Sequence, residues 1–322
     1  MTTDIQIAQG ILLNTALPIK HRMRAMFYLR NVPSFESIKA ISTIFKDKSV
    51  LLKHEGAYVL GQMLVKESLK ILLDVLKDEE QDEIARHEAG EALGNFVELF
   101  SEENISSSQN ENKKSAKDEN RITYNEILET LKKYSEHKIA PIRETCYIAL
   151  KKHEEYQKIK SEDNSFKPIL SPFLSHDPAY PYIKKDFDSV SKIYLDAEEC
   201  LYKRYKAMFY LRNLNTKESI EKIGEAINDK SALFKHEIAF VFGQMRNKLS
   251  IPYLKCLLED ENEHGMVRHE AAEALGAIGS EESLDIVLKF INDSVDVVRE
   301  SVEVAIDIHD YETGLDEEYA IL

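Results

Sequence analysis

Apolar residues recur along the chain at intervals of three and four, the spacing of an amphipathic helix. Within residues 268–278, the apolar positions that share one helix face are Ala271, Ala274, Leu275 and Ile278. A second apolar stripe, over residues 71–76, predicts the partner helix of such a pair. Only 11 glycines and 8 prolines occur, too few for the many turns of a long all-β fold. The pattern therefore predicts an all-α protein.

The chain contains two copies of one unit. The heptapeptide Ala-Met-Phe-Tyr-Leu-Arg-Asn fills residues 25–31 and again residues 207–213, 182 positions later. Two tripeptides repeat with the same offset: residues 53–55 and 235–237 read Lys-His-Glu, and residues 86–88 and 268–270 read Arg-His-Glu. One constant offset across these segments indicates a duplicated unit.

Each copy has a shorter internal period. The basic residue Arg268 has equivalents at Arg22, Lys53, Arg86 and Arg143 in the first half and at Arg204, Lys235 and Arg299 in the second. The steps are 31 or 33 residues, apart from one of 57, and a period near 31 accommodates two helices and two turns. The segment Arg-x-Glu-Ala-Ala-Glu-Ala-Leu-Gly resembles the inner helix of HEAT-like repeats. Because one helix pair cannot bury its apolar stripe alone, we expect a HEAT-like solenoid of eight helical pairs, four in each pseudo-symmetric half.

The two halves differ in length and are joined by a proline-containing segment. The step of 57 exceeds its counterpart by 26 residues, and the excess coincides with a polar insertion at about 101–121. Residues 157–186 hold four of the eight prolines, and proline interrupts helices. We therefore predict an N-terminal half over 1–156, a linker over 157–186 and a C-terminal half over 187–322.

A His-Glu dipeptide occupies one repeat position in the two central repeats of each half. These dipeptides are His54-Glu55, His87-Glu88, His236-Glu237 and His269-Glu270. The flanking repeats carry Met23-Arg24, Glu144-Thr145, Tyr205-Lys206 and Glu300-Ser301 at the equivalent positions. A residue needed for solenoid packing would recur in every repeat or differ only at the caps. The pattern therefore indicates a shared site, although a Glu in the first turn of a helix also favours the helix dipole.

Imidazole nitrogens and carboxylate oxygens are both metal ligands, so these eight residues are candidate donors. Adjacent inner helices of a solenoid run parallel with axes about 10 Å apart, which lets donors from neighbouring repeats converge on one ion. If the halves face each other, two divalent ions and four carboxylates meet near the pseudo-twofold axis with balanced charge. No cysteine occurs at these positions, which disfavours a structural zinc site, and mixed nitrogen and oxygen donors suit iron or manganese.

The remaining histidines lie outside this register. His153-Glu154 and its repeat counterpart His309-Asp310 fall near helix ends, where a cation has a structural role, so we exclude them from the site. Surface positions are predicted for the histidines that have no matching counterpart, which are His21, His137, His176 and His264.

Charge and cysteine content limit the classes of function. The 322 residues include 42 Lys and Arg but 57 Asp and Glu, for a net charge of −15. This acidic balance disfavours a nucleic-acid binder and suits a cationic partner. The chain has no run of 18 apolar residues and no basic-then-apolar N-terminal stretch, so we expect neither a membrane span nor a signal peptide. Three cysteines without a CxxC pair predict a reducing compartment, the cytoplasm, with the nucleus as an alternative.

The repeat plan and the four His-Glu pairs together resemble deoxyhypusine hydroxylase over nearly the whole chain. The most specific segments are Leu-Leu-Lys-His-Glu at 51–55 with Gly-Gln-Met at 61–63, Arg-His-Glu-Ala-Gly-Glu-Ala-Leu-Gly at 86–94, and their repeats at 233–237, 243–245 and 268–276. The resemblance implies a non-haem di-iron monooxygenase that uses O2 to hydroxylate the aminobutyl group of deoxyhypusine in a eukaryotic translation factor, which completes hypusine. Its cofactors would be two iron ions, Fe2+ in the reduced form.

The same resemblance implies roles for individual residues. One iron would be held by His54, His87 and Glu88, and the other by His236, His269 and Glu270. Glu55 and Glu237 would lie beside the irons, as further ligands or in contact with the substrate amines or a bound water. Candidate substrate contacts are Gly61, Met63, Gly243 and Met245. The two glycines also suit close helix packing, and the two methionines also suit a core.

Two other functions are consistent with parts of this pattern. A metal-free HEAT-repeat scaffold that binds a protein on its concave face explains the repeats, but it leaves the restriction of His-Glu to the central ones unexplained. A metal-dependent hydrolase would use the same donors with zinc or manganese. Iron content separates the three hypotheses. No pattern in the sequence determines the oligomeric state.

Overall fold

The computed structural model describes residues 2–96, 123–163 and 171–314. In these ranges the secondary structure is helical, with sixteen α-helices, three short 3-10 helices and no strand. The predicted all-α class with eight helical pairs is therefore confirmed, whereas the polar insertion at 101–121 lies outside the described residues. Within the same ranges, no helix combines the length and the apolar character that a membrane span requires.

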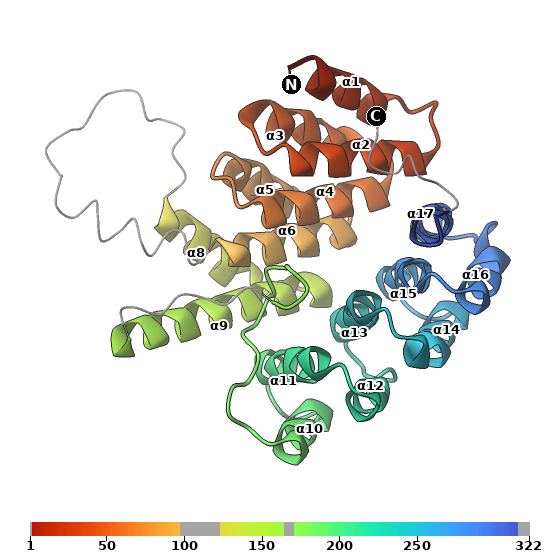
Figure 1. Ribbon diagram of the computed structural model, residues 1–322. Coiled ribbons are helices and arrows are strands. Elements are labelled where there is room, and N and C mark those ends of the chain that lie inside the picture. Colours follow the sequence, from red (N-terminus) through yellow and green to blue (C-terminus); the bar gives the residue numbers. More distant parts are fainter. Residues whose placement is uncertain (1, 97–122, 164–170, 315–322) are drawn as a thin grey trace, which may run out of the picture.

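The N-terminal lobe consists of four pairs, each with an outer and an inner helix. In chain order these are α1 (Thr2–Leu13) with α2 (Ile19–Asn31), α3 (Phe35–Ser42) with α4 (Val50–Met63), α5 (Ser68–Lys77) with α6 (Glu83–Asn95), and α8 (Tyr124–Tyr134) with α9 (Ala140–Glu162). The 3-10 helix η1 (Thr43–Lys46) follows α3 directly. Figure 1 shows these pairs stacked on one another, from red at α1 to green at α9.

The C-terminal lobe repeats this order. Its pairs are α10 (Phe187–Leu195) with α11 (Leu201–Leu214), α12 (Lys217–Gly224) with α13 (Ala232–Met245), α14 (Ile251–Glu259) with α15 (Gly265–Ile278), and α16 (Glu281–Val287) with α17 (Asp296–Glu312). Two 3-10 helices, η2 (Lys248–Ser250) and η3 (Leu288–Phe290), lie next to the outer helices α14 and α16. Each half therefore presents one row of inner helices, and these rows carry the His-Glu pairs.

Helix α9 continues to Glu162, beyond residue 156, where the sequence predicted that the linker starts. Residues 157–162 contain neither proline nor glycine, so nothing in the sequence ends the helix at that point. The irregular part of the connection begins after this helix, and residues 171–186 of it are described.

A buried arginine fixes the start of four inner helices. The side chains of Arg22, Arg86, Arg204 and Arg268 donate from Nε to the carbonyl ten residues earlier, at Leu12, Leu76, Tyr194 and Leu258. Three of these arginines also pair with an aspartate 25 residues later: Arg22 with Asp47, Arg204 with Asp229 and Arg268 with Asp293. Each arginine thus ties its inner helix to the preceding outer helix. Since Arg86 and Arg268 directly precede His87 and His269, they also fix how these histidines are turned about the helix.

The four helices that carry the His-Glu pairs begin at side-chain caps. Ser49 and Ser231 accept hydrogen bonds from the backbone nitrogens of Leu52 and Phe234, while Asp82 and His264 accept them from Ile84 and Met266. Such caps satisfy N–H groups that a helix leaves free at its start. His264, for which we predicted a surface position, is half-buried and also lies 2.8 Å from a carboxylate oxygen of Glu83 in the other lobe.

The ends of the two stacks meet, which turns their inner faces toward each other. Helix α17 packs against α2 and α4, and α9 packs against α11 and α13. At the first junction Arg24 donates to both carboxylate oxygens of Asp307, at 2.8 and 2.6 Å. At the second junction the Tyr202 hydroxyl donates to Glu155 at 2.6 Å. Helices α4 and α6 consequently lie opposite α13 and α15 (Figure 1).

Candidate metal centre

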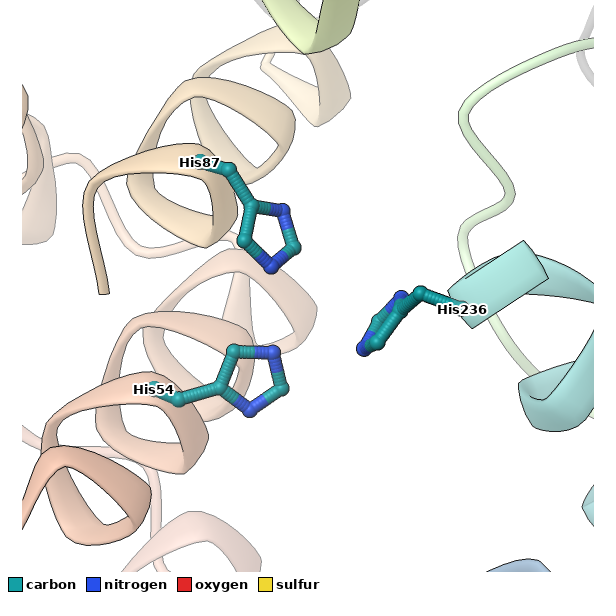
Figure 2. Close-up of side chains that lie close together, drawn as sticks. All are labelled: His54, His87 and His236. Atoms are coloured by element: carbon teal, nitrogen blue, oxygen red, sulfur yellow. The ribbon is translucent and has the colours of Figure 1, made fainter. Parts of the chain in front are cut away.

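The four histidines of the His-Glu pairs meet between the lobes. His54 lies on α4 and His87 on α6, and Figure 2 shows both rings beside His236, which comes from α13 in the opposite lobe. The ring centroids are 5.3 Å apart for His54 and His87 and 5.2 Å apart for His87 and His236. His269 of α15 completes the cluster, with its centroid 4.9 Å from that of His54 and 5.4 Å from that of His236. Side chains from four helices and both lobes thus share one space.

These rings are buried without the hydrogen bonds that buried polar groups require. His87 and His269 have no exposed surface. In the described part of the chain, neither ring nitrogen of His87, His236 or His269 has a hydrogen-bond partner. Leaving a buried polar atom unpaired costs about 1–3 kcal/mol. A bound cation would take these nitrogens as ligands and remove that cost, so the donor set fits a metal ion.

Two groups of three side chains bring their donor atoms close together. Within the first group, His54, His87 and His236, the donor atoms lie within 4.8 Å of one another, and the same is true within the second group, His236, His269 and Glu270. A carboxylate stands beside a histidine in each lobe at the same distance. Glu88 Oε2 is 3.5 Å from His54 Nε2, and Glu270 Oε2 is 3.5 Å from His236 Nε2. The equal distances reflect the pseudo-twofold symmetry. The arrangement offers nitrogen and oxygen donors to two ions.

The other two glutamates of the pairs are also buried, with Glu55 6% and Glu237 2% exposed. Glu55 Oε1 lies 3.0 Å from Nδ1 of His54, which orients that ring. Glu237 Oε1 has no hydrogen-bond partner among the described residues. The structure therefore brings all eight predicted donors together, and Oε1 of Glu237 is available to a ligand.

Four residues that the sequence analysis did not assign also line the site. A cavity of about 80 Å³ between the lobes is lined by six of the eight donors and, in addition, by Tyr58, Glu91, Phe240 and Glu273. The added residues form two pairs at the repeat offset of 182, Tyr58 with Phe240 and Glu91 with Glu273. Each of the two glutamates follows a histidine of the cluster by four positions, which places it on the same helix face. The repeat offset and the helical spacing are signals for both carboxylates in the sequence, but ordinary helix sequence has the same spacing.

Burial keeps several of these carboxyl groups neutral when no cation is bound. Desolvation raises the pKa of Glu91, Glu237 and Glu273 well above the ordinary value for a glutamate. The same cause, with repulsion from Glu55, raises the pKa of Glu270 to about 8. A cation in the cavity would stabilise the ionised carboxylates and so favour proton release.

The histidines respond to burial in the opposite sense. Desolvation, together with repulsion from neighbouring histidines, lowers the pKa of His87, His236 and His269 well below the ordinary value. Burial also acts to lower the pKa of His54, but the hydrogen bond with Glu55 and the nearby carboxylate of Glu88 outweigh it, and this pKa rises. Three imidazoles are thus neutral at pH 7, which is the form that binds metals.

The cavity opens at the C-terminal ends of the inner helices. A groove of about 450 Å³ shares four lining residues with the cavity, Tyr58, Phe240, Glu270 and Glu273, and continues outward along Gly243, Ala277 and Ile308. At the other end, the contact between His264 and Glu83 joins the N-termini of α15 and α6. Two glutamates line the groove at the end that it shares with the cavity, and two arginines, Arg30 and Arg246, also line it. The acidic residues of the groove therefore lie at its inner end, next to the metal centre.

The two Gly-Gln-Met segments lie at the ends of α4 and α13, where their members have different surroundings. A Cβ on Gly61 would lie 2.6 Å from the Cβ of Ala92 on α6. A Cβ on Gly243 would lie 3.2 Å from Ala274 on α15, and Gly243 also lines the groove. Met63 is half-buried, and Met245 is buried in the core. Close helix packing accounts for Gly61, and of these four residues it is Gly243 that borders the groove.

Replacing Gly61 by alanine is expected to destabilise the protein more than replacing Gly243. The added methyl group at residue 61 would overlap both Cβ and Cα of Ala92, and such overpacking costs about 1–3 kcal/mol. The looser contact at Gly243 predicts a loss below about 1 kcal/mol. Urea unfolding of the two variants measures both changes. Equal losses would contradict the packing role of Gly61.

Comparison with known proteins places this geometry in a family. The family model for HEAT repeats matches residues 220–307. The deoxyhypusine hydroxylase of Drosophila melanogaster is 41% identical over 98% of this chain and 95% of its own length. The human deoxyhypusine hydroxylase is 38% identical over 96% of this chain and 92% of its own length. A solved structure of the human enzyme in complex with glycerol superposes with a TM-score of 0.83 and 36% identity, covering 96% of both chains.

Proposed function

The chain belongs to the deoxyhypusine hydroxylase family, and we propose that its eight buried His and Glu donors hold two iron ions for the O2-dependent hydroxylation of deoxyhypusine. The observation that carries this proposal is the cluster of four imidazoles, because seven of the eight ring nitrogens have no protein hydrogen bond in the described chain. When bound, ferrous iron supplies the electrons that activate dioxygen for oxygen insertion into a C–H bond. The chain is an enzyme of hypusine biosynthesis.

One iron is held by His54, His87 and Glu88, and the other by His236, His269 and Glu270. Each set contains two histidines and one carboxylate, the donor pattern of non-haem iron with open coordination positions. The positions of Glu88 and Glu270, each 3.5 Å from a histidine nitrogen, support this division between the lobes. Four ionised carboxylates would balance the charge of two divalent ions in this buried space.

The substrate side chain is a lysine extended by an aminobutyl group, so it carries positive charge and a long methylene chain. The groove matches both properties. Glu270 and Glu273 line the inner end of the groove, where a bound cation would favour their ionised form, although Arg30 and Arg246 line the groove too. The rings of Tyr58 and Phe240, 6.0 Å apart, provide apolar surface for the methylenes. Glu237, with its free Oε1, is placed to accept a hydrogen bond from a substrate ammonium group. Glu55 serves the same purpose from the other lobe and also holds the ring of His54.

A metal-free scaffold does not suit this interior. Such a protein would keep seven unpaired ring nitrogens and a group of buried glutamates at a permanent cost in stability. The burial of these donors therefore favours the metal enzyme.

The protein partner is a translation factor that contains deoxyhypusine, and we place the reaction in the cytoplasm, with the nucleus as a second location. Cys146, Cys200 and Cys256 are free thiols, which suits a reducing compartment.

Reconstitution and product analysis test the proposal directly. Protein loaded with ferrous iron under anaerobic conditions should contain about two irons per chain, one for each set of two histidines and a carboxylate. Incubation with the deoxyhypusine-bearing factor, reductant and O2 should increase the mass of the factor by one oxygen atom. A protein that binds no iron, or an unchanged mass with the iron-loaded protein, would refute it.

A further inference from the structure

The connection between the halves passes beside the metal centre, and both lobes hold it there. Residues 171–180, named here the strap, follow α9 and precede α10. The side chain of Gln62 on α4 bonds to both backbone groups of His176: the His176 N–H donates to Oε1 at 3.0 Å, and Nε2 donates to the carbonyl at 3.3 Å. Gln244 on α13 donates from Nε2 to the hydroxyl of Ser175 at 3.0 Å. The two glutamines, equivalent under the 182-residue offset, thus hold the strap from opposite lobes.

A buried arginine fastens the strap further. Arg212 on α11 has no exposed surface and donates to both carboxylate oxygens of Asp177, at 2.9 and 2.5 Å. Its Nη1 also donates to Oε1 of Gln244 at 2.8 Å, and its guanidinium lies 5.0 Å from the ring centroid of Phe173. Buried, charge-assisted contacts of this kind hold a segment in one position.

The strap covers one of two grooves that the repeat symmetry would otherwise make equivalent. The open groove is lined by Gly243, Ala277 and Ile308. The corresponding residues of the N-terminal lobe are Gly61, Asn95 and Lys152. Asn95 and Lys152 are both only 3% exposed, whereas Ala277 and Ile308 are half-buried.

Contacts show what lies over the covered groove. The Lys152 ammonium group is 5.7 Å from the ring centroid of Tyr180 in the strap, and Gln62 next to Gly61 bonds to His176 of the strap. In the described residues, the strap therefore lies over the position that is equivalent to the open groove.

The first residues of the strap form the rim of the open groove. Phe173, Leu174 and Ser175 line it. Leu174 is 76% exposed and has a φ of 59°, in the left-handed region that a leucine side chain disfavours. An exposed apolar side chain held in a strained conformation gains nothing for folding. Its position at the opening to a buried site suggests a contact with what binds there.

We propose that the strap closes one of two equivalent grooves and forms the rim of the other, so that the substrate protein reaches the metal centre from one side only and packs against Leu174. This inference rests on the proposed function. It commits to the deoxyhypusine-bearing protein as the occupant, since the groove is continuous with the metal cavity and its two glutamates, Glu270 and Glu273, lie at the end shared with that cavity. Gln62 and Gln244 are positioning residues, which act through the strap.

Two variants of the iron-loaded full-length protein test the direction of approach and the contact. Ile308→Lys introduces a cation into the open groove, at the position that Lys152 occupies in the covered groove. Repulsion between this lysine and the cationic substrate side chain should raise KM for the protein substrate at least about 10-fold. Leu174→Asn removes the apolar contact with a residue that tolerates positive φ, and it should raise KM and Kd about 10-fold, which corresponds to about 1.4 kcal/mol. In Leu174→Asn, kcat should stay within about two-fold, because that residue lies away from the reacting atoms.

Matched controls separate these effects from general damage. Ile291→Lys adds the same charge at an exposed apolar residue outside the groove. Lys184→Gly changes a second exposed residue of positive φ in the same connection. Both should keep wild-type KM. Iron content, anaerobic Kd for the deoxyhypusine-bearing protein, kcat and KM are measured for all four variants.

Wild-type KM in Leu174→Asn or in Ile308→Lys, with normal iron content, would overturn the proposal. A rise of KM in Lys184→Gly as large as in Leu174→Asn would overturn the proposed contact between Leu174 and the substrate protein. It would indicate that loosening the connection between the halves is enough to raise KM. A wild-type protein that binds no iron or does not hydroxylate would instead contradict the proposed function, so the two failures are distinguishable.

Discussion

Replacing His87 or His269 by alanine is expected to lower bound iron to one ion per chain or fewer and to reduce hydroxylation by at least about 100-fold. Both rings have no exposed surface, and their nitrogens have no hydrogen-bond partner in the described chain, so a metal ligand is the role that their surroundings support. Metal analysis and product mass measure the two losses. His21→Ala, at an exposed histidine outside the cluster, is the control and should retain both properties.

The fold of these variants should survive, and this separates ligand loss from unfolding. Truncating a buried apolar side chain removes favourable contacts, whereas truncating His87 or His269 also removes two unpaired polar atoms from the interior. We therefore expect the metal-free variants to unfold within about 1 kcal/mol of the metal-free wild type. Urea unfolding measures this difference. Full iron content and activity in His87→Ala would disprove the ligand assignment.

Replacing Glu237 or Glu55 by glutamine is expected to preserve iron and reduce turnover of the protein substrate by about 100-fold. Glutamine keeps the shape of the side chain, but it removes the negative charge that a substrate ammonium group requires and adds an N–H donor facing that cation. Because Glu237 Oε1 has no hydrogen-bond partner among the described residues, we expect a larger loss of turnover for Glu237→Gln than for Glu55→Gln. Iron content together with kcat and KM distinguishes substrate binding from metal binding.

The control for this charge change is Glu282→Gln on the exposed surface of α16, which should behave as wild type. If Glu237→Gln or Glu55→Gln loses its iron, the residue concerned is a metal ligand, and its assignment to the substrate is wrong. If iron and turnover both remain normal, neither role holds. Only normal iron content with reduced turnover distinguishes these two carboxylates from Glu88 and Glu270.

The repeat register predicted that the four His-Glu pairs occupy equivalent helix positions, and the structure brings these side chains together. Helical spacing predicted the inner helices, and the offset of 182 predicted that His54 and His236, like His87 and His269, occupy equivalent positions. Glu91 and Glu273 obey the same two rules, but their motif also reads as ordinary helix sequence. Their role became visible only when both carboxylates were found lining the cavity. Gly61 shows the converse: its place in a repeated motif suggested a site residue, whereas its neighbour Ala92 explains it by packing.

The sequence by itself determined the helical class, the eight-pair repeat and the position of each His-Glu pair, because helix periodicity and repeat register depend on residues that are close in the chain. Only the tertiary structure decided that the two lobes close on each other, since that closure depends on contacts such as Arg24 with Asp307, 283 residues apart. It also decided that the strap covers one groove and leaves the other open. The repeat symmetry makes the two grooves equivalent in sequence, and only the path of the connection through space distinguishes them.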